Sequence, residues 1–344
     1  MPKVNIIIPV YNQEKYIGKC LETVINQTEK DIEAIVVDDK SKDKSLEIIK
    51  KYEEQYPNII KVLENPINKG VAYTRNKALE IADGEYIGFV DSDDYIEYDM
   101  YEKLYNISKE YNLDIARANR RLVKGPLKLN FLIRNTDINT RKIIYPKQEL
   151  EYLTFETPCV TNKLFKRELI GGRVFPENLK WEDYPFCIPL LYRADKVGTY
   201  PEYLYNYRLN LFGTTVSDSK KINPNILDIF TCSEQIIKEL SKYNSKNLNS
   251  RLNFLAIQNA LQRLRDILLS NISNKEKREL ISLFSRLIEL KYGTYRGNEM
   301  YEEYRKLSKI HNAIMNIIEN FYLESSNEND ITIIENRIKQ MVKK

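Results

Sequence analysis

Short runs of β-branched residues alternate with amphipathic stretches along the first half of the chain. A strand with a buried pattern is followed each time by apolar residues at helical spacing. This alternation predicts an α/β fold in which a Rossmann-like, mostly parallel sheet is flanked by helices on both faces. The predicted elements are strands at residues 4–10, 32–38, 59–63 and 86–90 and helices at residues 15–25, 45–56 and 72–82.

The pattern changes from about residue 220 onward, where glycine almost vanishes and long segments of helical periodicity appear. A chain of 344 residues is long enough for two domains. We therefore expect a sheet domain over residues 1–219 and an all-α C-terminal domain over residues 220–344. The expected C-terminal helices are residues 226–240, 252–269, 277–290, 301–322 and 331–342.

Composition narrows the chemistry that the chain can perform. His311 is the only histidine, and the four cysteines form no Cys-x-x-Cys pair, so reduced thiols are expected rather than zinc ligands or disulfides. There is no apolar run of about 18 residues and no secretory signal pattern, which predicts a cytoplasmic protein. Acid–base chemistry is therefore expected to come from carboxylates.

The net charge of +4 is unevenly distributed, because residues 117–147 carry many Lys and Arg residues and Asp137 as their only acid. This stretch is either a solvated surface or a contact for an anionic acceptor or membrane. Peripheral association with the inner face of the cell membrane is therefore one hypothesis. Homo-oligomer formation stays open, and no nucleic-acid partner is expected.

Two acidic clusters directly follow predicted strands, where open α/β sheets bind their ligands. One is Asp38-Asp39, and the other is Asp91-Ser92-Asp93-Asp94. Carboxylates this close resist joint ionisation unless a cation such as Mn²⁺ or Mg²⁺ lies between them. Either cluster could also be an ordinary helix-entry turn. The chain has neither G-x-G-x-x-G nor a P-loop motif, so phosphate groups need another binding element.

Several short motifs follow one another along the chain, and these are Ile7-Ile8-Pro9-Val10-Tyr11-Asn12, Val37-Asp38-Asp39-Lys40-Ser41, Asn68-Lys69-Gly70, Arg75-Asn76, Gly84-Glu85-Tyr86, Asp91-Ser92-Asp93-Asp94 and Trp181-Glu182-Asp183. Together, the motifs resemble the family-2 glycosyltransferases of the GT-A fold, in the family's order and over roughly residues 1–210. The resemblance implies an inverting enzyme that transfers a single sugar from a UDP-sugar to an acceptor hydroxyl. The acceptor would belong to a growing surface glycan, a teichoic-type polymer, a lipid-linked glycan or a glycoprotein of a bacterium.

The resemblance implies how the nucleoside would be bound. Pro9, Val10 and Tyr11 would line the base pocket, with Tyr11 stacking near the uracil. Asp39 would accept a hydrogen bond from the uracil ring N–H. Arg75 would lie near the base and the diphosphate.

The resemblance likewise implies how the rest of the donor would be bound. Asp91 would hold the ribose, Ser92 follows it, and Asp93 would bind Mn²⁺ or Mg²⁺, which in turn would hold both phosphates. Arg208 would approach the diphosphate. The second basic residue that usually follows this arginine is replaced by Asn210.

The acidic pair Glu182-Asp183 is the expected catalytic element. In the implied inverting reaction, Asp183 would accept the proton of the acceptor hydroxyl, a contribution of about 10²–10⁴-fold. Glu182 would support it. Trp181 would either stack on an acceptor sugar or serve as a core or hinge aromatic residue.

Two other functions remain as alternatives. A sugar-nucleotide pyrophosphorylase would need a Gly-rich basic loop where this chain has residues 10–14. A degenerate transferase that only binds its ligand should lack an acid, whereas Asp39, Asp91, Asp93 and Asp183 are all present. Because the chain lacks Gln-x-x-Arg-Trp, we expect single additions rather than processive synthesis. The sequence does not indicate which sugar, acceptor or linkage is used.

Overall fold

The chain forms two compact units, which are Met1–Asn178 with Glu182–Asn210 and Leu179–Trp181 with Leu211–Lys344. The boundary expected at residues 219/220 falls within residues 209–221, outside the described residues. The computed structural model describes residues 1–124, 127–129, 144–146, 158–208, 222–243, 248–294, 316 and 328–343.

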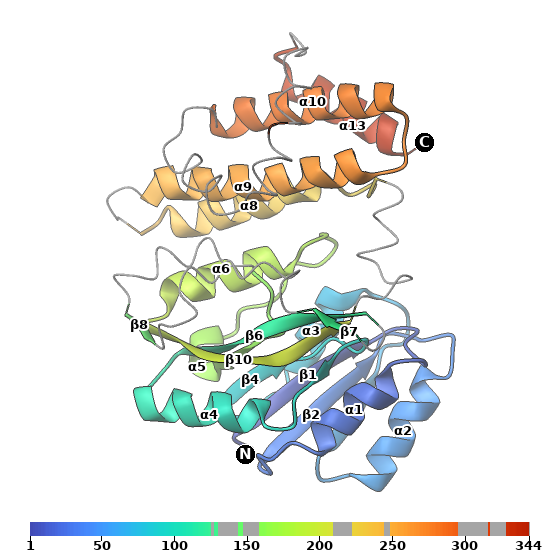
Figure 1. The fold of residues 1–344 in the computed structure, drawn as a ribbon, viewed down its shortest axis with the longest axis vertical. Coiled ribbons are helices and arrows are strands. Elements are labelled where there is room, and N and C mark those ends of the chain that lie inside the picture. Colours follow the sequence, from blue (N-terminus) through green and yellow to red (C-terminus); the bar gives the residue numbers. More distant parts are fainter. Residues whose placement is uncertain are drawn as a thin grey trace. The chain divides into compact units, whose positions relative to one another are not determined.

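A mixed sheet forms the centre of the first unit (Figure 1), and its strand order is β3-β2-β1-β4-β9-β6-β10-β5. The first four strands of this order are mutually parallel, and β6 is parallel to β10. Antiparallel β9 joins these two parallel groups, and β5 is antiparallel to β10. β7 pairs with β6, and β8 pairs with β10. The strands are β1 (Val4–Val10), β2 (Ile32–Asp38), β3 (Ile60–Glu64), β4 (Tyr86–Phe89), β5 (Tyr95–Ile96), β6 (Ile115–Lys124), β7 (Leu127–Leu129), β8 (Ile144–Pro146), β9 (Lys163–Lys166) and β10 (Lys196–Arg208).

Each face of the sheet has its own hydrophobic core, because successive strand residues point to opposite faces. In β1, Ile6 and Ile8 join the core that also contains residues of α1, α2 and α4, whereas Ile7 joins the core formed with α3, α5 and α6. This arrangement confirms the predicted α/β class. The helices are α1 (Ile17–Ile25), α2 (Ser45–Gln55), α3 (Val71–Leu79), α4 (Met100–Tyr111), α5 (Arg167–Ile170) and α6 (Asp183–Arg193).

The second unit is helical in its described part. α8 packs on α9, α9 on α10 and α10 on α13. Ser273 and Glu276 form a capping box at the start of α10, and the Asp330 side chain caps α13. The C-terminal helices are thus confirmed, although the segment predicted at residues 301–322 lies outside the described residues except for residue 316. The helices are α8 (Asp228–Leu240), α9 (Leu248–Leu269), α10 (Asn274–Tyr292) and α13 (Ile331–Val342).

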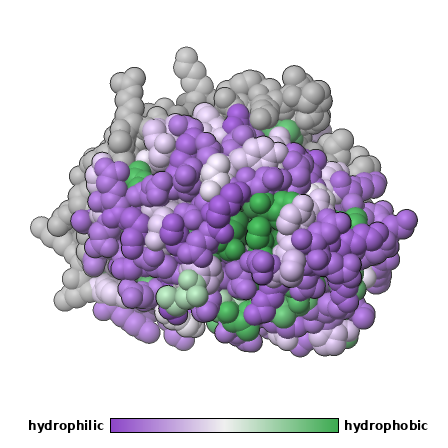
Figure 2. Space-filling model, turned by 90° about the horizontal axis from the view of Figure 1, so that it is seen from below, coloured by the Kyte–Doolittle hydropathy of each residue, from purple (hydrophilic) through white to green (hydrophobic). Residues whose placement is uncertain are grey.

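One face of the molecule is mainly polar where it is described (Figure 2). Seen from below (Figure 2), hydrophilic residues dominate, and hydrophobic residues gather in a small hollow near the centre of the view. No helix in the described ranges is both long and apolar enough to cross a membrane.

Candidate active site

The predicted base-pocket residues lie where β1 ends, beside the end of β2. Val10 pairs with Asp38 across the two strands, and the Asp39 N–H donates to the Val10 carbonyl at 2.8 Å. The two following loops are also joined, because the Asn12 N–H donates to Ser41 Oγ at 3.0 Å. Pro9 and Val10 are buried, whereas Tyr11 is 39% exposed. The exposed Tyr11 ring can therefore contact a ligand, and the backbone on either side of it is held by these hydrogen bonds.

Asp39 holds the start of α3. Its carboxylate accepts hydrogen bonds from the backbone N–H groups of Lys69 at 2.8 Å and Gly70 at 2.7 Å. Asn65 Nδ2 donates to it at 2.8 Å. Gly70 has a φ of +84°, a conformation that glycine adopts without strain. The motif Asn68-Lys69-Gly70 thus fixes the direction of the helix that carries Arg75.

Asp38 also contributes a buried carboxylate at this edge. Its Oδ2 accepts a hydrogen bond from the Ser41 N–H at 3.0 Å. Its Oδ1 is buried without a hydrogen-bond partner in the described part of the chain. A buried acceptor without a partner is unfavourable, so a ligand that donates a hydrogen bond here would be stabilised.

Arg75 lies at the centre of an ion-pair cluster that the sequence did not predict. The residue is 3% exposed, and its Nη2 lies 2.8 Å from Asp91 Oδ1. Its Nη1 lies 2.8 Å from both Glu182 Oε1 and Asp183 Oδ1. The Phe175 ring centroid lies 5.2 Å from the guanidinium carbon. One cation therefore joins the predicted ribose ligand to both predicted catalytic acids.

Electrostatics place Asp183 in the protonation range of a general base. Burial raises the pKa of Asp183 to about 7, against the opposing effect of Arg75 and with further increases from Glu182 and Asp91. Burial lowers the pKa of Arg75, but the three surrounding carboxylates outweigh this effect and raise it. Arg75 is therefore always charged, whereas Asp183 exchanges its proton near neutral pH.

The acidic turn after β4 is fastened to β10 through Asp94. Tyr205 donates its hydroxyl hydrogen to Asp94 Oδ2 at 2.7 Å and accepts a hydrogen bond from the Asp91 N–H at 3.2 Å. The Arg208 N–H donates to Asp94 Oδ1 at 2.7 Å. Burial, and then the charges of Asp93 and Asp91, raise the pKa of Asp94 well above its usual value. The sequence indicated no individual role for Asp94 or Tyr205, although Asp94 is the last residue of the acidic motif Asp91-Ser92-Asp93-Asp94.

Arg208 and the acidic turn therefore lie at the same edge of the sheet. The Arg208 guanidinium lies over the rings of Tyr16 and Tyr95, with centroid distances of 5.0 Å and 5.3 Å. Ser92 is 6% exposed, and Asp93 is half-buried. Among the described residues, no three His, Cys, Asp or Glu side chains are grouped so as to hold a metal. A cation at Asp93 would need further ligands from substrate and water.

Lys163 is a second cation near the predicted catalytic acids, at a position where the resemblance to the family implies contact with a donor or acceptor sugar. Its side chain is fully buried, and Nζ donates to the Cys159 carbonyl at 2.9 Å and to Asn162 Oδ1 at 3.0 Å. Its charge helps to lower the pKa of Asp183, against the larger effect of burial. The ammonium group therefore favours the ionised form of Asp183.

The basic stretch at residues 117–147 lies only partly within the described residues. Arg117 is 2% exposed, and its Nε donates to Thr199 Oγ1 at 2.7 Å. Arg121 forms an ion pair with Glu97 at 2.9 Å. These two arginines are thus bound inside the sheet unit, whereas residues 130–143 lie outside the described residues.

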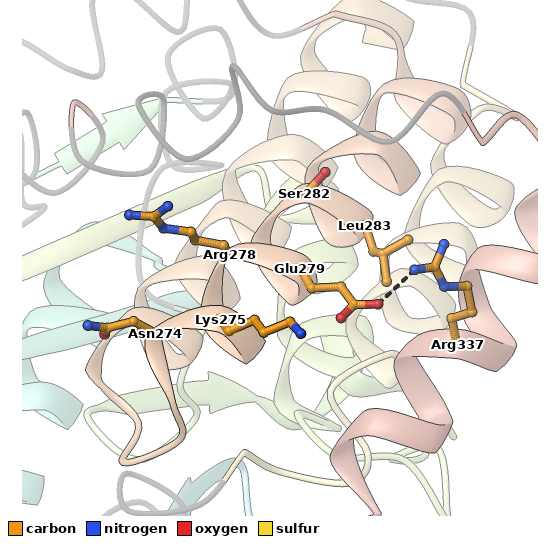
Figure 3. Close-up of a pocket in the computed structure, with 7 residues that line it drawn as sticks. All are labelled: Asn274, Lys275, Arg278, Glu279, Ser282, Leu283 and Arg337. Carbon is orange, nitrogen blue, oxygen red and sulfur yellow. Dashed lines mark hydrogen bonds and ion pairs between the residues drawn. The ribbon is translucent and has the colours of Figure 1, made fainter.

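The helical unit contains a pocket of its own between the start of α10 and α13, with a volume of about 670 Å³ (Figure 3). Arg337 and Glu279 form an ion pair at 2.7 Å in it. The pocket contains none of the predicted site residues, so we do not assign the chemistry to it. Its lining residues are Asn274, Lys275, Arg278, Glu279, Ser282, Leu283 and Arg337.

Comparison with known proteins identifies the family of this chain. The profile of "Glycosyl transferase family 2" matches residues 5–172. A poly(ribitol-phosphate) beta-glucosyltransferase of Bacillus spizizenii is 36% identical over 225 residues, which cover 62% of this chain and 33% of that protein. An uncharacterized glycosyltransferase of Haemophilus influenzae is 34% identical over 194 residues, which cover 56% of this chain and 72% of that protein.

A solved structure has the same fold. The crystal structure of S. aureus TarS 1-349 in complex with UDP-GlcNAc matches with a TM-score of 0.65 and 21% identity, over 93% of this chain and 89% of that one. The mixed sheet with its C-terminal helices therefore matches a GT-A fold. The chain belongs to glycosyltransferase family 2.

Proposed function

We propose that this chain is an inverting glycosyltransferase that transfers a single sugar from a UDP-sugar to a hydroxyl group of a surface polymer. The observation that carries the proposal is the Arg75 cluster, in which Asp183, with its pKa raised to about 7, shares a cation with Asp91 of the acidic turn. A base is most effective when its pKa lies near the working pH. The cluster therefore supports proton transfer beside the donor.

Asp183 would accept the proton of the acceptor hydroxyl while the acceptor oxygen forms its bond to the anomeric carbon. The bond between that carbon and the diphosphate oxygen would break on the opposite face, and UDP would leave with the bonding electron pair. Glu182, which binds the same Arg75 nitrogen, would help to keep the guanidinium in place. The base would thus act from a fixed position.

The nucleoside would occupy the edge formed by the loops after β1 and β2. Pro9, Val10 and Tyr11 would surround the uracil, and Tyr11 has the exposed ring that stacking requires. Asp39 would accept a hydrogen bond from the ring N–H. Its carboxylate already accepts three hydrogen bonds, and a carboxylate has sites for about four. The buried Oδ1 of Asp38 is a second acceptor near this position.

The ribose and diphosphate would extend along the acidic turn. Asp91 would bind the ribose, and Ser92 lies between it and Asp93, which would bind the metal. A Mn²⁺ or Mg²⁺ ion fits here because such ions accept one or two carboxylates and complete their shell with phosphate oxygens and water. When bound, it would stabilise the negative charge of the departing diphosphate. Arg208 would add positive charge at the same edge.

A teichoic-type polymer is the acceptor that we favour over other glycans, lipid-linked glycans and glycoproteins. The support is the name of the Bacillus spizizenii relative, a poly(ribitol-phosphate) beta-glucosyltransferase. The alignment spans only 33% of that protein, so the acceptor has to be tested directly. Peripheral binding to an anionic membrane would bring the enzyme to such a polymer.

A UDP-release assay tests this function. The full chain is incubated with a panel of UDP-sugars, with and without poly(ribitol phosphate), in Mn²⁺ or in EDTA. We expect release from one UDP-sugar that requires the metal and is increased by the polymer. Failure of every UDP-sugar to be turned over, together with no binding of UDP, would overturn the donor assignment.

A further inference from the structure

The Arg208 guanidinium contacts two tyrosine rings at the edge of the sheet that carries the acidic turn. Its carbon lies 5.0 Å from the centroid of the Tyr16 ring and 5.3 Å from that of the Tyr95 ring. Both distances are within the range of a cation–π contact. All three residues belong to the sheet unit.

The pairing of β5 with β10 places Tyr95 beside Arg208. Tyr95 is opposite Asn206 in the antiparallel register, two residues before Arg208. The Arg208 N–H donates to Oδ1 of Asp94, the residue that precedes Tyr95. The backbones that carry the ring and the guanidinium are therefore joined on both sides of this contact.

Helix α1 places the second ring. Tyr16 is the residue at which α1 begins, and its carbonyl accepts hydrogen bonds from the N–H groups of Lys19 at 3.0 Å and Cys20 at 3.1 Å. The helix is also bound to β5, because the Ile96 N–H donates to Thr23 Oγ1 at 3.3 Å. Both rings are thus carried by elements that are hydrogen-bonded within the sheet unit.

These contacts leave the Arg208 guanidinium able to bind an anion. A ring face attracts the cation but accepts none of the hydrogen bonds that the guanidinium donates in its own plane. Arg208 Nε is buried without a hydrogen-bond partner in the described part of the chain, which is unfavourable until an acceptor arrives. Arg75, in contrast, already binds three carboxylates. Of these two arginines, Arg208 is therefore the better receptor for phosphate oxygens.

We propose that Tyr16 and Tyr95 are positioning residues that hold the Arg208 guanidinium in place for the diphosphate of the donor. This inference rests on the proposed function, because it takes the diphosphate as the anion that Arg208 meets. The two tyrosines act through Arg208 and do not touch the substrate. Their ring faces carry the effect, so their hydroxyl groups are dispensable for it.

The first test compares a leucine pair, Tyr16→Leu with Tyr95→Leu, with a phenylalanine pair, Tyr16→Phe with Tyr95→Phe. Calorimetric titration measures the binding of UDP and of uridine, which lacks the diphosphate. We expect the leucine pair to raise the Kd for UDP by about five- to thirtyfold and the Kd for uridine by less than about twofold. The phenylalanine pair keeps both ring faces and should match the wild type. Tyr98→Leu, at a 45% exposed position just after β5, is the matched control and should also match it.

The second test asks whether the rings act through Arg208. The leucine pair is combined with Arg208→Met, and UDP binding is measured again. We expect the pair to weaken binding by less than about twofold in this background, because the cation that it positions is absent. Additive losses, equal losses for UDP and uridine, or unchanged UDP binding by the leucine pair would overturn the positioning role. If the pair does not fold, Tyr16→Leu and Tyr95→Leu alone carry the same comparison.

A third measurement does not depend on the nucleotide. The Nε–H signal of Arg208 is followed by ¹H–¹⁵N NMR and assigned by its absence in Arg208→Met, and inorganic pyrophosphate is the probe. We expect pyrophosphate to shift the signal in the wild type and in the phenylalanine pair, and to do so only at higher concentration in the leucine pair. A wild type that binds no UDP would refute the proposed donor, and the pyrophosphate titration would still decide this inference. A signal that pyrophosphate does not move, or moves equally in all variants, would overturn it.

Discussion

Asp183 Oδ1 lies 2.8 Å from Arg75 Nη1, and this short distance determines how the proposed base behaves. The Arg75 side chain is 4% exposed, whereas that of Asp183 is 22% exposed. The guanidinium therefore stabilises the carboxylate from the protein interior and leaves part of it accessible to an acceptor. Asp183 is also the first residue of α6, where the helix dipole favours a negative charge.

The first prediction concerns the pH dependence of transfer. Burial raises the pKa of Asp183 to about 7, and only its deprotonated form can accept a proton, so kcat should fall as the pH decreases through about 7. In Arg75→Met the cation that opposes this rise is lost, so the acid limb should move to higher pH. pH–rate profiles measure both effects. Lys61→Met, which removes an exposed lysine, should leave the limb in place.

The second prediction separates the roles of the two proposed catalytic acids. Asp183→Asn should lower kcat by about 10²–10⁴-fold, because the proton acceptor is removed. Glu182→Gln should lower kcat by a smaller factor, since Asp183 and Asp91 still bind Arg75. Calorimetric titration with UDP should give similar affinities for both variants and the wild type. Turnover by Asp183→Asn at the wild-type rate would mean that another group is the base.

The local elements of the fold were predictable because they depend on short-range patterns. β1 and β2 bury nearly every residue, and the strands were predicted at the residues where they occur. The acidic turns could be placed for the same reason, since parallel strands put their carboxyl ends at one edge. The later strands β6, β9 and β10 were not predicted, and the four residues of antiparallel β9 give too short a pattern.

The Arg75 cluster could not be derived from the sequence. Arg75 and Asp183 are 108 positions apart, and a single arginine in a helix does not indicate its partners. The hydrogen bond between Tyr205 and Asp94 joins residues 111 positions apart, and it could not be derived from the sequence either. The resemblance to a family supplied candidate residues for the donor and the base. The cation that joins them is visible only in the structure.

The third prediction tests the fastening of the acidic turn. Tyr205→Phe removes the hydroxyl that joins Asp94 Oδ2 to the Asp91 N–H and leaves both short of a partner. Because both groups are at least partly buried, the free energy of unfolding should fall by about 1–3 kcal/mol. Denaturant unfolding measures this change. The donor KM should also rise as Asp91 becomes less well placed, whereas Tyr98→Phe, at an exposed position, should change it little.

The fourth prediction concerns the metal. If Asp93 is the protein ligand and the diphosphate supplies further ligands, Mn²⁺ should strengthen binding of UDP but not of uridine. EDTA should abolish transfer, and added Mn²⁺ should restore it. Asp93→Asn should raise the Mn²⁺ concentration needed for half-maximal activity. Equal binding of UDP with Mn²⁺ and with EDTA would argue against a metal at this site.

The fifth prediction concerns Asp39, whose two oxygens accept the backbone N–H groups of Lys69 and Gly70. In Asp39→Asn one acceptor becomes an amide donor, which cannot satisfy a second N–H. The start of α3 should loosen, with a loss of about 1–3 kcal/mol in the free energy of unfolding. UDP affinity should fall as well, because the proposed contact to the uracil N–H is lost.

Asp31→Asn is a suitable control for this prediction, since Asp31 is exposed. The pH–rate profile of Asp39→Asn adds a further readout. α3 also carries Arg75, so its displacement should move the acid limb of kcat in the same direction as Arg75→Met, though by less. A loss of UDP affinity with an unchanged acid limb of the pH–rate profile would mean that Asp39 acts only in the base pocket. Movement of the limb would show that Asp39 also helps to place the cation beside the base.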